Sequence, residues 1–370
     1  MTIDGFYGII PAGGVGSRLW PLSRADAPKF LHDLTGSGRT LLQSTFSRLA
    51  PLAGEDRIMV VTGRAHRSAV EAQLPALTDA NIVLEADPRE STVAVLLAAA
   101  ILERREPGVV VGSFAADHVI EDERGFRRAV TDAVAAARTG KIATIGITPT
   151  EPAIGFGYIQ AGEPAGIPDA PRVAEVVRFV EKPGAEAARD YVASGDFLWN
   201  AAMFIARADV LLAELAETEP ELRAQIDELA AAWDDQATRG PAVDRIWPQL
   251  KKIAIDYAIA EPAAERGRMV VVPGDFDWDD VGDFSAIAKL HNGSSGGDRL
   301  AILSGQATVL ADGASGIVVS TTDRVISLVG VRDIVVVDTG DALLVTTTEH
   351  AQRVKQVVDA IRRSGNATVL

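Results

Sequence analysis

The sequence predicts an α/β protein: a Rossmann-like mixed, mostly parallel sheet with helices on both faces, then a small C-terminal unit of β-helix or prism type and a terminal helix. Three observations predict this architecture. Val- and Ile-rich runs alternate with stretches of helical periodicity over the first 290 residues. A Gly- and Ser-rich segment then interrupts the pattern. Short Val-rich runs about eight or nine residues apart occupy the remainder.

The predicted strands of the first part are continuously apolar, which is typical of parallel strands buried on both faces. They are Phe6–Ile10, Ile58–Thr62, Ile82–Leu84, Val109–Phe114 and Ile142–Ile147. The predicted helices between them are Leu41–Leu49, Ala65–Leu74, Thr92–Arg105 and Phe126–Arg138. Ligands of such sheets bind outside the carboxyl ends of the strands, so a site is expected there.

The pattern loosens after residue 150, where we expect an inserted lobe. Its predicted strands are Gly155–Gln160, Ala174–Glu181 and Ala201–Ala206, and its predicted helices are Asp209–Glu217 and Pro220–Trp233. The segment from His291 to Asp298 is the clearest linker. We therefore expect one domain over residues 1–290, made of a first lobe and this inserted lobe, and a second domain over residues 299–370.

The second domain is expected to be a small all-β unit closed by a helix. Its predicted strands are Ile317–Val319, Val325–Leu328, Ile334–Val337 and Leu343–Val345. Four such units do not distinguish a β-helix from a prism. The helix Glu349–Arg363 should pack through one apolar face, formed by Val354, Val357, Val358 and Ile361.

Composition excludes several classes of protein. The 36 Lys and Arg against 51 Asp and Glu give a formal charge of −15, and the sequence pI is about 4.8. Nucleic-acid and anionic-membrane binders need a basic surface, so neither partner is expected. The absence of cysteine excludes a disulfide scaffold and a thiol nucleophile. With no leader-like start and no apolar run longer than Val93 to Leu102, we expect a cytoplasmic protein.

The strongest chemical signal follows the first strand, in the string Pro-Ala-Gly-Gly-Val-Gly-Ser-Arg-Leu-Trp-Pro-Leu-Ser-Arg. Its glycines free backbone N–H groups for an anion, and cations follow within 12 residues. The residues concerned are Gly13, Gly14, Gly16, Arg18, Arg24 and Lys29. Neither a Walker A loop nor a Gly-x-Gly-x-x-Gly fingerprint fits the string. A tight turn would explain the glycines but not the cations, so a polyphosphate site is expected.

Acidic residues supply possible Mg²⁺ ligands at two places. Asp117 follows the strand Val109–Phe114, and it could serve Mg²⁺ or cap a helix. His118 beside it fits a structural imidazole better than a metal ligand. Five carboxylates lie between Asp275 and Asp283, where one could pair with Asp117 or the group could be a solvated loop.

Two further strings combine a cation with groups that hydrogen-bond hydroxyls. Glu181-Lys182-Pro183 follows a strand, and Trp199-Asn200 lies in the next apolar segment. A lysine for phosphate, with a carboxylate and an amide for hydroxyls, would suit a phosphorylated sugar. A surface ion pair and a turn asparagine are the alternatives.

Together these strings resemble the sugar-1-phosphate nucleotidyltransferases over roughly the first 290 residues. The string Leu-Trp-Pro-Leu-Ser-Arg is most similar to the mannose-1-phosphate guanylyltransferases. The tail Val335-Val-Val-Asp-Thr-Gly-Asp also resembles the segment that follows the catalytic domain in those enzymes. Some members carry a further isomerase domain of cupin type. The sequence ends before such a domain, so we expect one activity.

The resemblance implies a role for each matching residue. The nucleotide phosphates would lie at Gly13, Gly14, Gly16 and Arg18, with Lys29 near the reacting phosphates. Asp117 and Asp280 would bind Mg²⁺. The sugar phosphate would be received by Gly155, Glu181, Lys182 and Asn200, with Asp256 as a further candidate. The implied reaction is GTP plus mannose 1-phosphate giving GDP-mannose and pyrophosphate, and a homodimer is expected.

One string departs from the family. The nucleotide-facing turn, often Gly-Arg-Asn-Thr-Ala-Pro-Ala, here reads Pro-Arg-Glu-Ser-Thr-Val-Ala, which keeps Arg89 and Thr92 but loses the Asn and the Pro. Base selectivity is therefore open, and glucose 1-phosphate with UTP, dTTP or ATP remains an alternative pair of substrates. A non-catalytic regulator that binds nucleotide sugars is a further alternative, although such a protein should lack a loop cation or a metal carboxylate.

Overall fold

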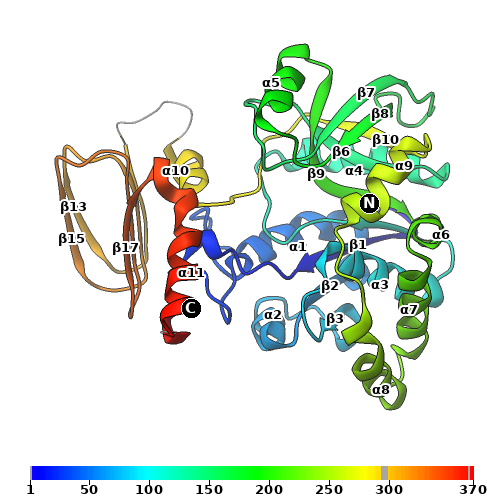
Figure 1. Ribbon diagram of the computed structural model, residues 1–370, viewed down its shortest axis with the longest axis horizontal. Helices are drawn as coiled ribbons and strands as arrows, with labels where there is room; N and C mark the ends of the chain where they lie inside the picture. Colours follow the sequence, from blue (N-terminus) through cyan, green and yellow to red (C-terminus); the bar gives the residue numbers. More distant parts are fainter. Residues whose placement is uncertain (1, 293–298, 366) are drawn as a thin grey trace. The chain divides into compact units, whose positions relative to one another are not determined.

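The computed structural model describes residues 2–292, 299–365 and 367–370, and it contains two compact units (Figure 1). Unit 1 comprises Met1–Gly13, Thr45–Ala116 and Ile120–Trp278. Unit 2 comprises Gly14–Ser44, Asp117–Val119 and Asp279–Leu370. The segment from Gly14 to Arg18, called the glycine loop below, therefore folds with the C-terminal part of the chain, whereas Gly13 belongs to unit 1. The predicted linker residues 293–298 lie outside the described residues.

Unit 1 is built on a nine-stranded sheet in the order β3-β2-β1-β4-β9-β6-β10-β8-β7. The strands are β1 Phe6–Ala12, β2 Ile58–Gly63, β3 Ile82–Glu85, β4 Val110–Ser113, β6 Ile142–Ile147, β7 Tyr158–Pro164, β8 Ala174–Val180, β9 Phe197–Arg207 and β10 Met269–Gly274. Pairing directions show that β8 and β9 run against the other seven. The predicted mixed, mostly parallel sheet is confirmed.

Helices cover both faces of this sheet. They are α1 Leu41–Ala53, which begins in unit 2, α2 Arg67–Gln73, α3 Glu90–Arg105, α4 Glu123–Arg138, α5 Ala185–Ser194, α6 Ala208–Thr218, α7 Pro220–Ala232, α8 Gln236–Ile246 and α9 Glu261–Glu265. Alternate residues of β1 separate the two faces: Ile9 joins the core around α3, while Gly8 faces Leu49 of α1. On that second face Phe126 of α4 packs edge-on against Phe114.

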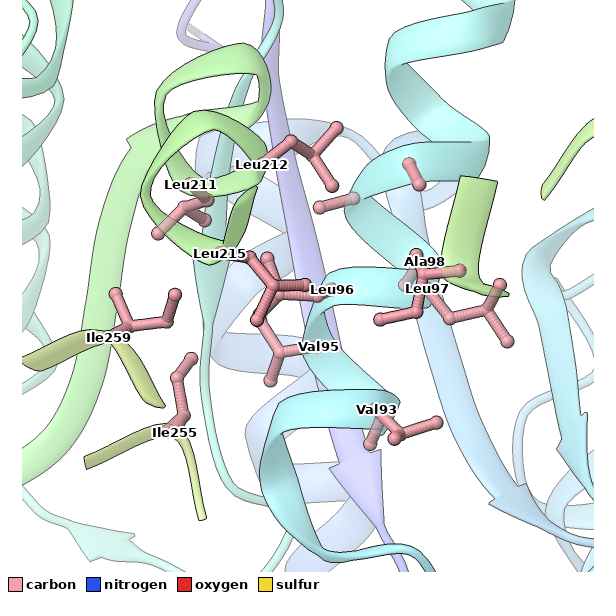
Figure 2. Close-up of a cluster of buried hydrophobic side chains, with 14 of the residues drawn as sticks. Val93, Val95, Leu96, Leu97, Ala98, Leu211, Leu212, Leu215, Ile255 and Ile259 are labelled. Carbon is pink, nitrogen blue, oxygen red and sulfur yellow. The ribbon is translucent and has the colours of Figure 1, made fainter. Parts of the chain in front are cut away.

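The core of unit 1 centres on α3, which is apolar on all sides and buried from Thr92 to Leu102. Figure 2 shows Leu211 and Leu215 of α6 beside Val95 and Leu96 of α3. A helix that is hydrophobic all round must be enclosed, and each fully buried Val or Leu side chain contributes about 1.5–3 kcal/mol. This packing holds the sheet rigidly beneath the loops at its edge.

Unit 2 contains a β-helix, because five of its strands, β12 to β16, stack in parallel in two sheets, and β17 is added antiparallel to β16. One sheet has the order β12-β14-β16-β17 and the other pairs β13 with β15. The strands are β12 Leu300–Ser304, β13 Thr308–Asp312, β14 Gly316–Ser320, β15 Val325–Val329, β16 Ile334–Asp338 and β17 Leu343–Thr347. Gly316, at φ +124°, lies where a Cβ would sit 2.0 Å from the carbonyl oxygen of Ile334, so only glycine allows this stacking.

Two helices and the N-terminal loop complete the core of unit 2. They are α10 Phe284–Asn292 and α11 Val354–Ser364. Leu19, Trp20 and Leu22 of the loop are buried with Val354 and Val358 of α11. The glycine loop is thus held by the C-terminal helix through a shared apolar core.

Several details of the sequence-based expectation were wrong. The strand expected from Gly155 begins only at Tyr158, and β10 was missed although it pairs in parallel with β6. The apolar face predicted for the last helix includes Val357, which is 41% exposed. It lies at the edge of the stripe formed by the other three positions, since successive residues turn by about 100°. No helix within the described ranges is both long and apolar enough to cross a membrane.

Candidate active site

Lys29 is the centre of the charged cluster in unit 2. It begins a 3₁₀ turn, Lys29–Leu31, and its side chain is only 8% exposed. Its Nζ lies 2.8 Å from Asp117 Oδ2 and 3.2 Å from Asp280 Oδ1, and it donates to the backbone oxygen of Asp280 at 2.9 Å. The structure therefore brings together three residues that are far apart in the sequence.

Electrostatics favours the charged forms of Lys29 and Asp280. Burial lowers the pKa of Lys29, but attraction by Asp117 and Asp280 outweighs burial and raises that pKa overall. Burial likewise raises the pKa of Asp280, but the charges of Lys29, His118 and Arg18 outweigh it, so the pKa of Asp280 is lowered. A buried ammonium between two carboxylates is a charged centre poised to interact with phosphates.

The glycine loop lies against the stem of Lys29. Gly16 has φ +70°, and a Cβ there would lie 2.9 Å from the Cβ of Lys29. Both the left-handed backbone and the close approach require glycine. Gly13, Gly14 and Val15 are exposed, so their backbone is accessible to a ligand.

The two loop arginines have different partners. Arg18 is exposed, and its Nη1 donates to Gln352 Oε1 at 3.1 Å. Arg24 instead forms an ion pair with Asp341 and donates to Thr339 Oγ1 at 3.2 Å. The charge of Arg24 is therefore already compensated, whereas the hydrogen-bond partner of Arg18 is a neutral amide oxygen.

The acidic string from Asp275 to Asp283 separates into different roles. Asp275 pairs with Arg128 and Arg172. Asp279 accepts the N–H of Val281 at 2.7 Å, and Asp283 accepts the N–H of Ser285 at 2.7 Å at the start of α10. Asp280, by contrast, pairs with Lys29. The string is thus not simply a solvated loop.

Asp117 is not a helix cap. It precedes the short strand β5, Val119–Ile120, and the cap of α4 is Asp122, which accepts from Arg124 and Gly125 at 3.0 Å. The alternative prediction, that Asp117 caps a helix, is therefore wrong. Its carboxylate and that of Asp280 converge on one point, the ammonium of Lys29.

This donor set fits Mg²⁺, which takes one or two carboxylates and completes its coordination with phosphate oxygens and water. Each carboxylate forms its ion pair with Lys29 through one oxygen. No group of three or more His, Cys, Asp or Glu side chains suited to a metal is present in the part of the chain that the structure describes. A metal held here would therefore need ligands from the substrate.

A second polar cluster lies within unit 1, around Asn200 of β9. Asn200 is 5% exposed, its Nδ2 donates to Asp256 Oδ1 at 3.1 Å, and its Oδ1 accepts from Thr144 Oγ1 at 3.0 Å. Its backbone N–H donates to the oxygen of Gly157 at 2.8 Å. Asn200 thus holds a fixed orientation at the end of the loop that precedes β7.

Glu181 and Lys182 lie beside this cluster and form an ion pair with each other. The Glu181 side chain is 8% exposed, while that of Lys182 is 61% exposed. Lys182 also has φ +45°, a left-handed conformation that is strained for a lysine and often found at functional sites. The buried carboxylate can orient a hydroxyl while the exposed ammonium meets a phosphate.

Gly157, which the sequence analysis did not select, shapes this cluster. A Cβ at Gly157 would lie 2.7 Å from Glu181 Oε2 and 3.3 Å from the Cβ of Asn200, whereas a Cβ at the predicted Gly155 would meet nothing within 4 Å. The string Gly-Phe-Gly-Tyr contains both glycines, and only the fold distinguishes them.

Asp256 lies among like charges. It begins the π-helical turn Asp256–Ala260, and burial, followed by repulsion from Glu181, raises its pKa to about 6. Its carboxyl group therefore titrates within about one pH unit of neutrality. That property allows it to donate or accept a hydrogen bond to a sugar hydroxyl.

Arg89 and Thr92, also of unit 1, are turned toward protein groups. Arg89 donates to Asp87 Oδ1 at 3.1 Å and to the oxygen of Leu250 at 3.2 Å. Thr92 is fully buried at the first turn of α3. The contacts of Arg89 stabilise the turn that follows β3, whereas the buried Oγ1 of Thr92 has no hydrogen-bond partner among the described residues.

Glu85, the last residue of β3, is a functional candidate that sequence reasoning missed. It is 6% exposed, and its Oε2 lies 3.4 Å from where a Cβ of Gly13 would stand. Burial, and then the charge of Asp87, raise its pKa to about 7. Its position at the carboxyl end of a buried strand could have drawn attention to it.

Comparison with known families gives two matches. A family model described as Nucleotidyl transferase matches residues 7–295. A second, described as MannoseP isomerase/GMP-like beta-helix domain, matches residues 308–361. Together they span the sheet of unit 1 and most of the β-helix.

Individual proteins match over nearly the whole chain. Mannose-1-phosphate guanylyltransferase of Escherichia coli (strain K12) is 36% identical over 369 residues, covering 99% of this chain and 75% of that protein. Xanthan biosynthesis protein XanB of Xanthomonas campestris pv. campestris (strain B100) is 37% identical over 369 residues, covering 97% and 74%. A crystal structure described as mannose-1-phosphate geranyltransferase from Thermus thermophilus has a TM-score of 0.83 at 29% identity, covering 97% of this chain and 99% of that one.

Proposed function

The chain belongs to the nucleotidyl transferase family, and we propose that this enzyme transfers GMP from GTP to mannose 1-phosphate, giving GDP-mannose and pyrophosphate. The observation that carries the proposal is the near-full-length similarity to the Escherichia coli mannose-1-phosphate guanylyltransferase. The Lys29 cluster supports it, because its two converging carboxylates suit Mg²⁺, whose charge would neutralise the phosphates of the two substrates.

The reaction needs no protein nucleophile. A phosphate oxygen of mannose 1-phosphate attacks the α-phosphorus of GTP in line, and the bond from that phosphorus to the bridging oxygen breaks as pyrophosphate leaves. The attacking oxygen is already ionised, so no general base is needed. Catalysis then rests on positioning and on charge neutralisation.

Named residues supply these two effects. Lys29 and Arg18 neutralise charge on the nucleotide phosphates, and the backbone at Gly13, Gly14 and Gly16 accepts them. Lys182 binds the sugar phosphate, while Glu181, Asn200 and Asp256 orient sugar hydroxyls. These roles follow the chemistry of each cluster.

Asp117 and Asp280 would hold Mg²⁺, which when bound supplies charge neutralisation at the phosphate oxygens. Lys29 would then keep both carboxylates aligned, since it contacts each of them.

Glu85 would select guanine. A carboxylate can accept from both N1–H and the 2-amino group of guanine, a pair of donors that adenine lacks. A deeply buried carboxylate also penalises any base that leaves it unpaired. Guanine selectivity would thus reside in Glu85 rather than in the altered turn after β3.

One assay tests the reaction directly. Purified protein is incubated with Mg²⁺, each of five nucleoside triphosphates, and mannose or glucose 1-phosphate, and pyrophosphate is measured. GTP with mannose 1-phosphate should give the highest rate, and the rate should vanish on chelation of the metal. A higher rate with UTP, dTTP or ATP and glucose 1-phosphate would replace the assignment, and no release with any pair would defeat the enzyme proposal.

We further propose that the protein is a cytoplasmic homodimer. Sedimentation equilibrium at micromolar concentration would measure the mass against the 39.0 kDa of one chain. Cell fractionation would test the location, and recovery in the membrane fraction would oppose it.

A further inference from the structure

We propose that Gln352, in the turn before α11, is a positioning residue that holds Arg18 ready for the nucleotide phosphates; this rests on the proposed function. Gln352 belongs to the 3₁₀ segment Thr348–Arg353, which follows the last strand of the β-helix. The C-terminal segment would then act in nucleotide binding as well as in folding.

The contact has a defined chemistry. Arg18 Nη1 donates to Gln352 Oε1 at 3.1 Å, and Gln352 Nε2 donates to Asp283 Oδ2. A guanidinium can only donate and a carboxylate can only accept, so the amide has one workable orientation between them. Asp283 itself is fixed by the N–H groups of Ser285 and Ala286 at the start of α10, at 2.7 and 3.1 Å.

The neutrality of the amide matters as much as its geometry. An acidic residue at this position would compensate the charge of Arg18, as Asp341 does for Arg24. The amide instead fixes the guanidinium while leaving its full charge for a polyphosphate.

The surrounding packing fixes Gln352 relative to Arg18. Leu19, next to Arg18, shares a core with Ala351 and Val354, which flank the glutamine in the sequence. Trp20 Nε1 donates to the oxygen of Val369 at 2.6 Å, near the end of the chain. The backbone on both sides of the contact is therefore anchored within unit 2.

Four variants test the proposal. Gln352→Ala should raise the KM for GTP about tenfold, the size expected for losing a hydrogen bond to a charged group, with little change in the KM for mannose 1-phosphate. Gln352→Glu keeps an acceptor for Arg18 but neutralises it, and it should bind GTP no better than Gln352→Ala. In an Arg18→Ala background, Gln352→Ala should have no further effect. Gln356→Ala, at an exposed glutamine one turn along α11, is the matched control and should behave as wild type.

The outcomes separate this proposal from the proposed function. If wild type releases no pyrophosphate with any substrate pair, the proposed function fails, and calorimetric titration of GTP with Mg²⁺ still compares the same variants. Equal GTP binding by wild type and Gln352→Ala would overturn the positioning role. So would full retention of GTP affinity in Gln352→Glu, or additive effects of Arg18→Ala and Gln352→Ala. A loss of affinity for both substrates together would show that the contact is only structural, and it too would overturn the role.

Discussion

Individual carboxylates carry much of the chemistry of this chain, and their surroundings give them different roles. Asp279 and Asp280 are neighbours in the sequence, yet Asp280 faces Lys29 while Asp279 accepts the N–H of Val281. Burial raises the pKa of Asp279, whereas Lys29 outweighs burial and lowers that of Asp280. Sequence spacing alone could not make this distinction, because it does not show which side chain meets the lysine.

This difference gives a matched pair of variants. Asp280→Asn should lower turnover about 100-fold or more and raise the Mg²⁺ concentration needed for half-maximal rate, because a metal carboxylate and the partner of Lys29 are lost together. Asp279→Asn should stay near wild type, since an amide oxygen still accepts from Val281. Initial rates across a Mg²⁺ series measure both. The reverse ranking would transfer the metal role to Asp279.

Glu85 makes a pH-dependent prediction. Its pKa is about 7, and only the carboxylate can accept from both guanine donors. The KM for GTP should therefore fall about tenfold as pH rises from 6 to 8, because the ionised fraction grows by about that factor. Glu85→Gln should remove this dependence and should lose the preference of wild type for GTP over ITP, which lacks the 2-amino group. Unchanged selectivity in Glu85→Gln would exclude the residue from base recognition.

The same carboxyl group should also affect stability. Its pKa in the folded chain lies above the ordinary value of 4.5, so between those pH values the folded chain binds more protons than the unfolded chain. Its contribution to stability is present at low pH and is lost as pH rises through about 7. Glu85→Gln should therefore raise the melting temperature at pH 8 more than at pH 5, as differential scanning fluorimetry would report.

At the scale of elements, the sequence predicts best where burial is continuous. The predicted bounds of the strands up to Ile147 and of the helix Thr92–Arg105 agree with the structure within a few residues. Apolar runs and helical periodicity predict these elements well because both patterns indicate burial. The start of β7 was predicted too early. The Gly-Phe-Gly string has the composition of a strand, but it belongs to a loop. In that loop Gly157 lies close to Glu181, which is distant in the sequence. Pattern analysis does not detect such long-range contacts.

The two glycines of this loop provide a test at the level of the element. Gly157→Ala would push a methyl group against Glu181 Oε2, at 2.7 Å, and should displace that carboxylate. We expect the KM for mannose 1-phosphate to rise about tenfold, with little change in the KM for GTP. Gly155→Ala places its methyl group in open space and serves as the control. If Gly155→Ala has the larger effect, the sugar contacts the chain at Gly155 as the family resemblance implies.

At the scale of the molecule, sequence analysis placed one domain boundary at the linker. The second compact unit instead combines Gly14–Ser44 and Asp117–Val119 with Asp279–Leu370. Pattern and resemblance predicted the fold class and the residues of the Lys29 cluster. They did not predict that the segment 14–44 would share a core with the β-helix, because that packing joins Leu19 and Trp20 to residues about 300 positions away or more. The segment 14–44 thus depends for its stability on the C-terminal part of the chain.

This dependence predicts the pattern of hydrogen exchange. Amides that open in one cooperative unit exchange with similar free energies. Under native conditions in increasing denaturant, the amides of Leu19 and Trp20 should therefore lose protection together with those of β14 and β16, and not with the adjacent strand β1. Exchange measured by mass spectrometry on peptides from residues 6–12, 17–31 and 316–338 would report this. If the 17–31 peptide instead follows the 6–12 peptide at every denaturant concentration, the loop is stabilised by the sheet of unit 1, and the C-terminal helix contributes little to holding Arg18.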